Sequence, residues 1–184
     1  MDSNAKKMLW NMAGTAGLLM GLISTASMFI SQVMSTAQMP AFAVSVIGLV
    51  LWAAETGGCI YLMHMYMKKF AAACPEADNR ATFRMGMATA LLSALVYSAA
   101  SFANMAFISA ASYAEQFDMT MQQMAPLMDS NPPTVMDKML SSMPQITFIS
   151  NLIYCFLFGT VVSAILSRNI PSRDPFADYK PDQQ

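Results

Sequence analysis

Charged residues are missing from three long stretches of the chain, and these stretches indicate its architecture. Asp, Glu, Lys and Arg are absent from residues 8–54, 85–114 and 139–167. A helix needs roughly 20 apolar residues to cross a bilayer core of about 30 Å. The first stretch can hold one helix, a turn and half of another, and each of the others can hold one helix. The pattern predicts an all-α polytopic membrane protein with four transmembrane helices, at about residues 8–34, 41–67, 80–113 and 145–167.

Prolines, capping residues and basic residues mark the ends of these helices. Pro40 suits the first turn of the second helix, which should end at Lys68 and Lys69. Asp78 or Asn79 can cap the third helix. The transmembrane domain therefore covers residues 1–168. The proline-containing tail, residues 169–184, is expected to be extended and mobile in the cytoplasm.

The segment between the third and fourth helices, residues 114–144, has a different pattern. Its apolar positions recur at helical spacing, which is typical of a surface helix. They are Phe117, Met121, Met124 and Met128, followed by Val135, Met136, Met139, Leu140 and Met143. The spacing predicts two short amphipathic helices joined at Pro132 and Pro133. Such an extracytoplasmic hairpin could lie flat on the membrane or cap the bundle.

Basic residues gather on one side of the predicted membrane. Nine of the ten Lys and Arg residues precede the first helix, separate the second from the third, or follow the fourth. Only Lys138 lies on the other side. The positive-inside rule therefore predicts that both termini of this multi-pass protein are cytoplasmic. The net charge of −1 and the absence of a basic stripe argue against a nucleic-acid partner.

Small residues recur every fourth position in two of the helices. Gly17 and Gly21 form a GxxxG pair in the first helix, and Gly159 and Ser163 share this spacing in the fourth. Small residues let helix backbones approach closely in lipid. The simplest interpretation is packing within the chain. The alternative is a seam for a second copy or for another membrane protein, in addition to the lipid that surrounds the helices.

Glu55 is the most unusual residue in the predicted membrane segments. It lies near the centre of the second helix, where a charge costs about 2.5–3.5 kcal/mol on insertion scales. Glu55 should therefore face the interior of the bundle, be protonated, or both. One interpretation is a proton or cation relay or a substrate contact. The other is a structural hydrogen bond to Ser24, Tyr97, Ser98 or Ser101.

Other polar candidates are fewer and weaker. His64, the single histidine, lies nine residues after Glu55, or about 13–14 Å along a helix, so direct contact is not expected. Asn104 and Asn151 fall in the outer half of the membrane and are expected to form hydrogen bonds between helices. No catalytic motif is present, so an enzyme is not expected.

The 20 methionines raise the question of copper, because thioethers are soft ligands that suit Cu(I). Met63, Met65 and Met67 flank His64, but alternate residues do not share one face of a helix. Methionine therefore resembles a flexible substitute for leucine. Cys59, Cys74 and Cys155 show neither CxxC spacing nor an evident disulfide pair. No metal and no cofactor is expected.

Three segments resemble a known family. They are residues 16–24 (AGLLMGLIS), 82–86 (TFRMG) and 161–168, in which a Ser-Ala-Ile-Leu run meets a basic residue. With four helices and a long outer loop before the last, the chain resembles domain-of-unknown-function family 4199 over nearly its whole length. The resemblance implies a small bacterial inner-membrane protein of this topology. It implies no activity and no catalytic residues.

Two hypotheses for function follow. The first is a non-enzymatic accessory or scaffolding subunit, because small-residue seams and an amphipathic outer segment suit contacts with a partner or a second copy. The second is a small oligomeric transporter or channel-like protein with Glu55 in its pathway. Four helices are few for a monomeric carrier, so such a pathway would form at an interface.

Overall fold

The computed structural model describes residues 3–36, 40–74, 78–124 and 132–170, and these residues contain helices and no strand. The elements are α1 (Ser3–Thr36), α2 (Ala41–Ala73), α3 (Asn79–Ala103), the π-helix η1 (Asn104–Ile108), α4 (Ala110–Met124) and α5 (Pro132–Asn169). Four segments are long and apolar enough to cross a membrane: Ser3–Met34, Phe42–Ala73, Asn79–Ile108 and Ser141–Asn169. The prediction of an all-α chain with four such helices is confirmed.

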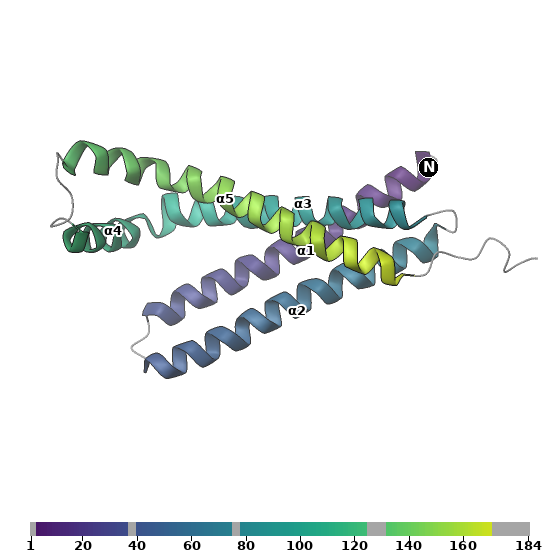
Figure 1. The fold of residues 1–184 in the computed structure, drawn as a ribbon, viewed down its shortest axis with the longest axis horizontal. Coiled ribbons are helices and arrows are strands. Elements are labelled where there is room, and N and C mark those ends of the chain that lie inside the picture. Colours follow the sequence, from purple (N-terminus) through teal and green to yellow (C-terminus); the bar gives the residue numbers. More distant parts are fainter. Residues whose placement is uncertain (1–2, 37–39, 75–77, 125–131, 171–184) are drawn as a thin grey trace, which may run out of the picture.

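The helix α3 is the central element of the bundle. It packs along α5 on one side and along α1 on the other, whereas α2 packs mainly along α1. Figure 1 shows that the beginning of α1, the end of α5 and the adjoining ends of α2 and α3 lie at the same end of the molecule. Most of the described basic residues belong to this end, which we call the basic end. They are Lys6, Lys7, Lys68, Lys69, Arg80, Arg84 and Arg168.

The helix ends follow the sequence signals closely. The Asp78 carboxylate accepts a hydrogen bond from the Ala81 backbone N–H at 2.8 Å, so Asp78 is the N-cap of α3. Pro40 stands immediately before α2 as its N-cap residue. Both α1 and α2 extend beyond the expected bounds at the basic end, because their lysines lie within helical turns that reach past the apolar span.

The third helix differs from the expected continuous helix over residues 80–113. The α-helical pattern changes at Asn104 into one π turn, where the Ser109 N–H donates to the Asn104 carbonyl oxygen at 2.8 Å. A new helix, α4, begins at Ala110. The buried Asn104 side chain, which donates a hydrogen bond to Gln32 of α1, lies at the start of this wider turn. A π-bulge adds a residue to one turn and redirects the helix.

The outer segment also differs from the expected pair of separate short helices. Its first arm is α4, and its second arm is continuous with the fourth membrane helix, because α5 begins at Pro132 rather than near residue 145. Proline is well tolerated in a first helical turn, and α5 also continues through Pro144. Figure 1 shows α4 and the start of α5 extending beyond the end where α1 and α2 meet.

The hydrophobic core lies towards the basic end. Fully buried side chains there include Met63, Met67 and Phe70 of α2 and Met85 of α3. Ile170, just after α5, also packs into this cluster, so the chain is still ordered two residues into the expected tail. The expectation of a mobile tail otherwise concerns residues 171–184, which lie outside the described residues.

Candidate functional site

A cavity of about 360 Å³ lies among α1, α2, α3 and α5. It takes side chains from all four helices that are long enough to cross a membrane. The residues that line it are Met20, Ser24, Trp52, Glu55, Thr56, Cys59, Ile60, Met63, Ala90, Ser93, Ala94, Tyr97, Asn151, Tyr154, Cys155, Phe158, Gly159 and Val162. We call this the Glu55 cavity. Its lining combines apolar and aromatic side chains with a few polar groups, as in many small-molecule sites.

Glu55 is half-buried in this cavity, near the middle of α2. Within the part of the chain that the structure describes, its carboxyl group has no hydrogen bond or ion pair. Ser24 and Tyr97, two of the expected structural partners, line the same cavity without bonding to it. The hydroxyl of Ser101, a third, instead accepts a hydrogen bond from the Asn151 side-chain amide at 3.1 Å. Ser24, Tyr97 and Ser101 therefore do not form the structural hydrogen bond that was one of the two expectations for Glu55.

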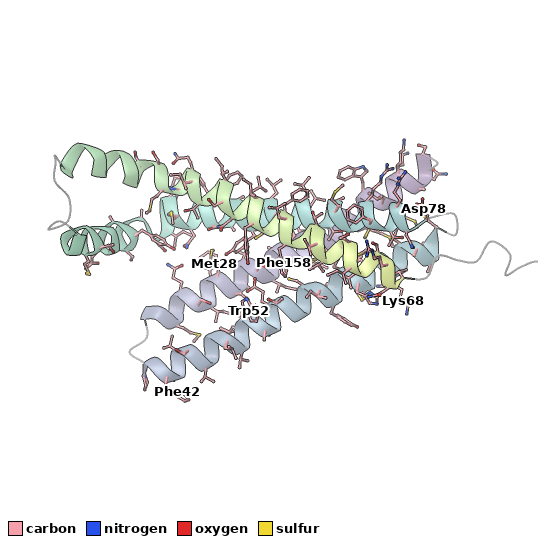
Figure 2. All side chains as sticks on the ribbon, in the orientation of Figure 1. Met28, Phe42, Trp52, Lys68, Asp78 and Phe158 are labelled. Carbon is pink, nitrogen blue, oxygen red and sulfur yellow. The ribbon has the colours of Figure 1, made fainter. Side chains whose placement is uncertain are left out.

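Three aromatic residues of α2 and α5 line the cavity and are also exposed on the surface of the bundle. Trp52 is 66% exposed, Tyr154 is 72% exposed and Phe158 is 48% exposed, although all three also line the cavity. Figure 2 labels Trp52 on α2 and Phe158 on α5. In a membrane, an exposed aromatic residue at this depth faces lipid. The cavity therefore has a lateral opening bordered by aromatic rings.

The cavity also contains two thiols, for which the sequence indicated neither a metal site nor a disulfide. Cys59 of α2 and Cys155 of α5 both line it, and both are free. Helical spacing could have indicated that Cys59 shares a face with Glu55, since the two are four residues apart. The position of Cys155 depends on the packing of α5, and nothing in the sequence identifies it.

His64 lies elsewhere. It does not line the Glu55 cavity, and its Nδ1 atom is buried without a hydrogen-bond partner in the described part of the structure. It lies on α2 between Met63 and Met67, whose buried side chains belong to the core at the basic end. The structure does not bring Glu55 and His64 into one site.

Asn104 belongs to a polar cluster of three side chains at the other end of the bundle. Its amide donates to the Gln32 side-chain oxygen at 3.0 Å, and its own side-chain oxygen accepts from the Ser109 hydroxyl at 3.1 Å. The Gln32 amide in turn donates to the Ser109 hydroxyl. Each member therefore bonds to both others. This cluster ties α1 to the π turn, and sequence reasoning missed Gln32 and Ser109.

The small residues of α1 face α3 within the same chain. A Cβ atom added to Gly17 would lie 2.7 Å from the Leu92 Cβ, and one added to Gly21 would lie 2.7 Å from the Val96 Cβ. Because both distances are far shorter than a normal contact, only glycine permits this approach. The GxxxG pair therefore packs within the chain.

The small residues of α5 also face α3. A Cβ atom on Gly159 would lie 2.5 Å from the Ala90 Cβ. The buried Ser163 side chain contacts Gly86 and donates a hydrogen bond to the Phe83 carbonyl oxygen at 3.1 Å. By contrast, a Cβ atom added to Gly57 or Gly58 of α2 would meet nothing within 4 Å.

Two of the three methionines that flank His64 are part of the core. Met63 and Met67 are buried on one face of α2, whereas Met65 is only half-buried. The described residues contain no group of three or more His, Cys, Asp or Glu side chains that could hold a metal ion. Of the outer-segment methionines, Met119 is exposed, and the side chains of Met121 and Met124 lie outside the description.

A family model described as "Protein of unknown function (DUF4199)" matches residues 15–168. The match includes the candidate spans Phe42–Ala73 and Asn79–Ile108 in full, the fourth up to residue 168, and the first from residue 15 onward. No curated protein and no solved structure matches the chain. The chain belongs to the DUF4199 family.

Proposed function

We propose that this DUF4199 protein is a small, oligomeric transporter or channel-like protein of the inner membrane, with Glu55 in its pathway. The observation that carries the proposal is the Glu55 carboxyl group, which lies in a cavity among four membrane-spanning helices without a bonding partner in the described residues. Ionisable residues inside a membrane are expensive and usually mark a substrate or ion pathway. A purely structural Glu55 would be expected to bond to a neighbouring helix.

The depth of Glu55 fits this role. It lies 14 residues after the start of α2 and 13 residues before Lys68, so it stands about 20 Å from either end of the span. A pathway needs its selective group at such a depth. The side chains around it offer hydroxyl, amide and thiol groups but no other charge, as expected for a passage rather than a salt bridge.

We propose transport rather than catalysis as the main activity. Acid–base chemistry in proteins most often uses a histidine or a pair of carboxyl groups. The described lining of the cavity supplies one carboxyl group and no imidazole.

We also propose that both termini are cytoplasmic, which is supported by the concentration of Lys and Arg at the basic end.

The experiment uses the native thiols as reporters of the cavity. The full chain is reconstituted in vesicles and treated with charged methanethiosulfonate reagents, one carrying a trimethylammonium group and the other a sulfonate. We expect both reagents to reach Cys59 and Cys155, with the cationic reagent reacting faster because of Glu55. In Glu55→Gln, the cationic preference should fall about tenfold, because a nearby charge changes the local ion concentration.

Cys74 provides the control, since it lies at the basic end outside the cavity. It should react only with reagent applied to the cytoplasmic side, with no change of preference in Glu55→Gln. If neither water-soluble reagent modified Cys59 or Cys155 from either side, a pathway through this cavity would be ruled out. Labelling of Cys74 in intact cells by an impermeant reagent would contradict the proposed orientation.

A second candidate, an accessory or scaffolding role, is favoured by the exposed face of α2. Ala53 and Gly57, four residues apart, are both exposed, and Gly57 has open space around it. The occupant we propose is a second copy of this chain, because this small-residue face of α2 adjoins the Glu55 cavity, and a second copy packed on it would border the opening between α2 and α5 without covering it. Gly57→Leu should then shift the oligomer, counted by photobleaching of single labelled particles in lipid, towards monomer. A monomeric wild-type protein would refute both the oligomer and this docking face.

A further inference from the structure

We infer that the Glu55 cavity binds a hydrophobic organic cation that enters from the bilayer through the opening between α2 and α5. The inference rests on the proposed function in one respect, since it names the substrate class of the same site. It is supported by three features of the cavity, namely its charge, its aromatic lining and the direction of its opening.

The charge of the cavity selects cations over anions. Of the described residues that line it, Glu55 is the one with a carboxyl group, and none is Lys, Arg or His. The other titratable groups in the lining are Cys59 of α2, Tyr97 of α3, and Tyr154 and Cys155 of α5, each of which becomes negative on ionisation. None of the surrounding helices therefore offers a positive group to an anion, and any of these groups that ionised would repel it.

The aromatic residues indicate an organic rather than a metallic cation. Trp52, Tyr97, Tyr154 and Phe158 come from three different helices and all line the one cavity. The face of an aromatic ring attracts a cation, and aromatic residues surrounding a carboxylate are suited to quaternary or protonated amines. Ca²⁺ or Mg²⁺ would need about six oxygen ligands. The cavity has one carboxyl group, and most of its wall is apolar or aromatic.

The size and opening of the cavity suit a ligand that dissolves in lipid. Its volume of about 360 Å³ lies at the lower end of the range for small-molecule sites. Trp52, Tyr154 and Phe158 remain largely exposed at its edge, on a surface that faces hydrocarbon in a membrane. A cation whose charge is covered by apolar groups can partition into the bilayer and reach this edge. Glu55 then supplies the counter-charge at a depth where few others exist.

The experiment measures binding of radiolabelled tetraphenylphosphonium to the full chain in lipid nanodiscs by equilibrium dialysis, with empty nanodiscs subtracted. We expect saturable binding that is lost by at least tenfold in Glu55→Gln, which keeps the size of the side chain. Trp52→Leu should weaken binding three- to tenfold. Trp10→Leu is the matched control, because Trp10 is exposed on α1 and does not line the cavity. It should bind like the wild type.

Two further measurements do not depend on the variants folding well. Tetraphenylborate has nearly the same shape with a negative charge, so it should not compete for the site. Bound tetraphenylphosphonium should also slow alkylation of Cys59 and Cys155 by N-ethylmaleimide at least fivefold, without slowing that of Cys74.

Binding that is absent, unsaturable, or equal in wild type and Glu55→Gln would overturn the inference. Equal competition by tetraphenylborate would do the same. The thiol accessibility experiment distinguishes this failure from failure of the proposed pathway. If charged reagents reach Cys59 and Cys155 with Glu55-dependent preference while tetraphenylphosphonium does not bind, the pathway stands and its substrate is of another class.

Discussion

The helices α2 and α3 have nearly the same hydropathy yet are packed very differently. Their membrane-spanning segments contain 32 and 30 residues and have mean hydropathies of 1.7 and 1.6. In the most apolar window of α3, 17% of residues are buried within the chain, compared with none in that of α2. Hydropathy indicates that both helices are apolar enough to lie in a membrane. It does not indicate which other helices they pack against.

The difference lies in where the small residues of the neighbouring helices point. Gly17 and Gly21 of α1 and Gly159 of α5 all bring their backbones close to α3. Gly57 and Gly58, the adjacent glycines of α2, have no atom near the position of a Cβ. Glycines in α1 and α5 therefore hold the bundle together, whereas those in α2 leave a surface open beside Glu55.

The same substitution on these two kinds of glycine should have opposite effects, and this is the largest effect we expect. Gly17→Ala would place a Cβ atom 2.7 Å from the Leu92 Cβ and 2.9 Å from the Thr89 carbonyl oxygen. Because a backbone oxygen cannot move without shifting the helix, we expect a loss of about 2 kcal/mol in the free energy of unfolding. Gly57→Ala should be neutral or stabilising by up to about 1 kcal/mol, since alanine favours helix. Unfolding by SDS in mixed micelles measures both values.

The distinction between the two kinds of glycine would be wrong if Gly17→Ala and Gly57→Ala lost similar stability. It would also be wrong if Gly17→Ala were neutral, because the close approach of α1 to α3 would then not contribute to the stability of the fold. Gly14→Ala serves as a control within α1, since a Cβ atom there meets nothing within 4 Å. It should behave like Gly57→Ala.

The polar cluster of Gln32, Asn104 and Ser109 tests the outer end of the same α1–α3 contact. Asn104→Leu removes one donor and one acceptor from this buried network and leaves Gln32 and Ser109 with fewer partners. We expect a destabilisation of about 1–2 kcal/mol, close to the upper values for interhelical hydrogen bonds in membranes. The same SDS titration measures it.

A double-mutant cycle shows whether this loss comes from the contact between helices. If Asn104 acts through Gln32, the effects of Asn104→Leu and Gln32→Leu will not add, and a coupling energy of at least about 0.5 kcal/mol will remain. Strictly additive effects would mean that the two side chains stabilise the bundle independently. The π turn at residues 104–108 would then need another explanation.

Sequence patterns predicted the spans well because each span had local signals at its ends. The carboxylate of Asp78 caps α3 as expected, and Pro40 marks the start of α2, whereas α2 continues past Lys68 and Lys69 to Ala73. The π turn at Asn104 was not predictable, because it depends on a hydrogen bond to Gln32, 72 positions away in the chain. The start of α5 was missed because Pro132 and Pro133 were read as a joint between two helices, although proline also suits a first helical turn.

The candidate site was predictable only in part for a related reason. Glu55 could be identified as a candidate from the sequence alone, because a charge within an apolar helix is costly in a membrane. Its surroundings depend on which faces α1, α3 and α5 turn towards α2, and apolar helices carry little amphipathic signal to fix this rotation. Tyr97 and Asn151 were therefore identified as polar residues, and Cys155 as a cysteine without an evident disulfide partner, but the three were not predicted to lie together. All three line the Glu55 cavity.

The smallest expected effect distinguishes two serines on the buried face of α3. The Ser98 hydroxyl is fully buried and has no hydrogen-bond partner in the described residues, whereas the Ser101 hydroxyl accepts from the Asn151 amide. An unpaired buried polar group costs stability, so Ser98→Ala should raise the free energy of unfolding by up to about 0.5 kcal/mol. Ser101→Ala leaves the Asn151 amide without its acceptor and should lower the free energy of unfolding by about 0.6 kcal/mol, the average for such bonds in bilayers.

The sign of these two effects matters more than their size. If Ser98→Ala were the more destabilising variant, the Ser98 hydroxyl would have a hydrogen-bond partner in the membrane. Glu55, one of whose expected partners was Ser98, would be tested first, in a double-mutant cycle of Ser98→Ala and Glu55→Gln.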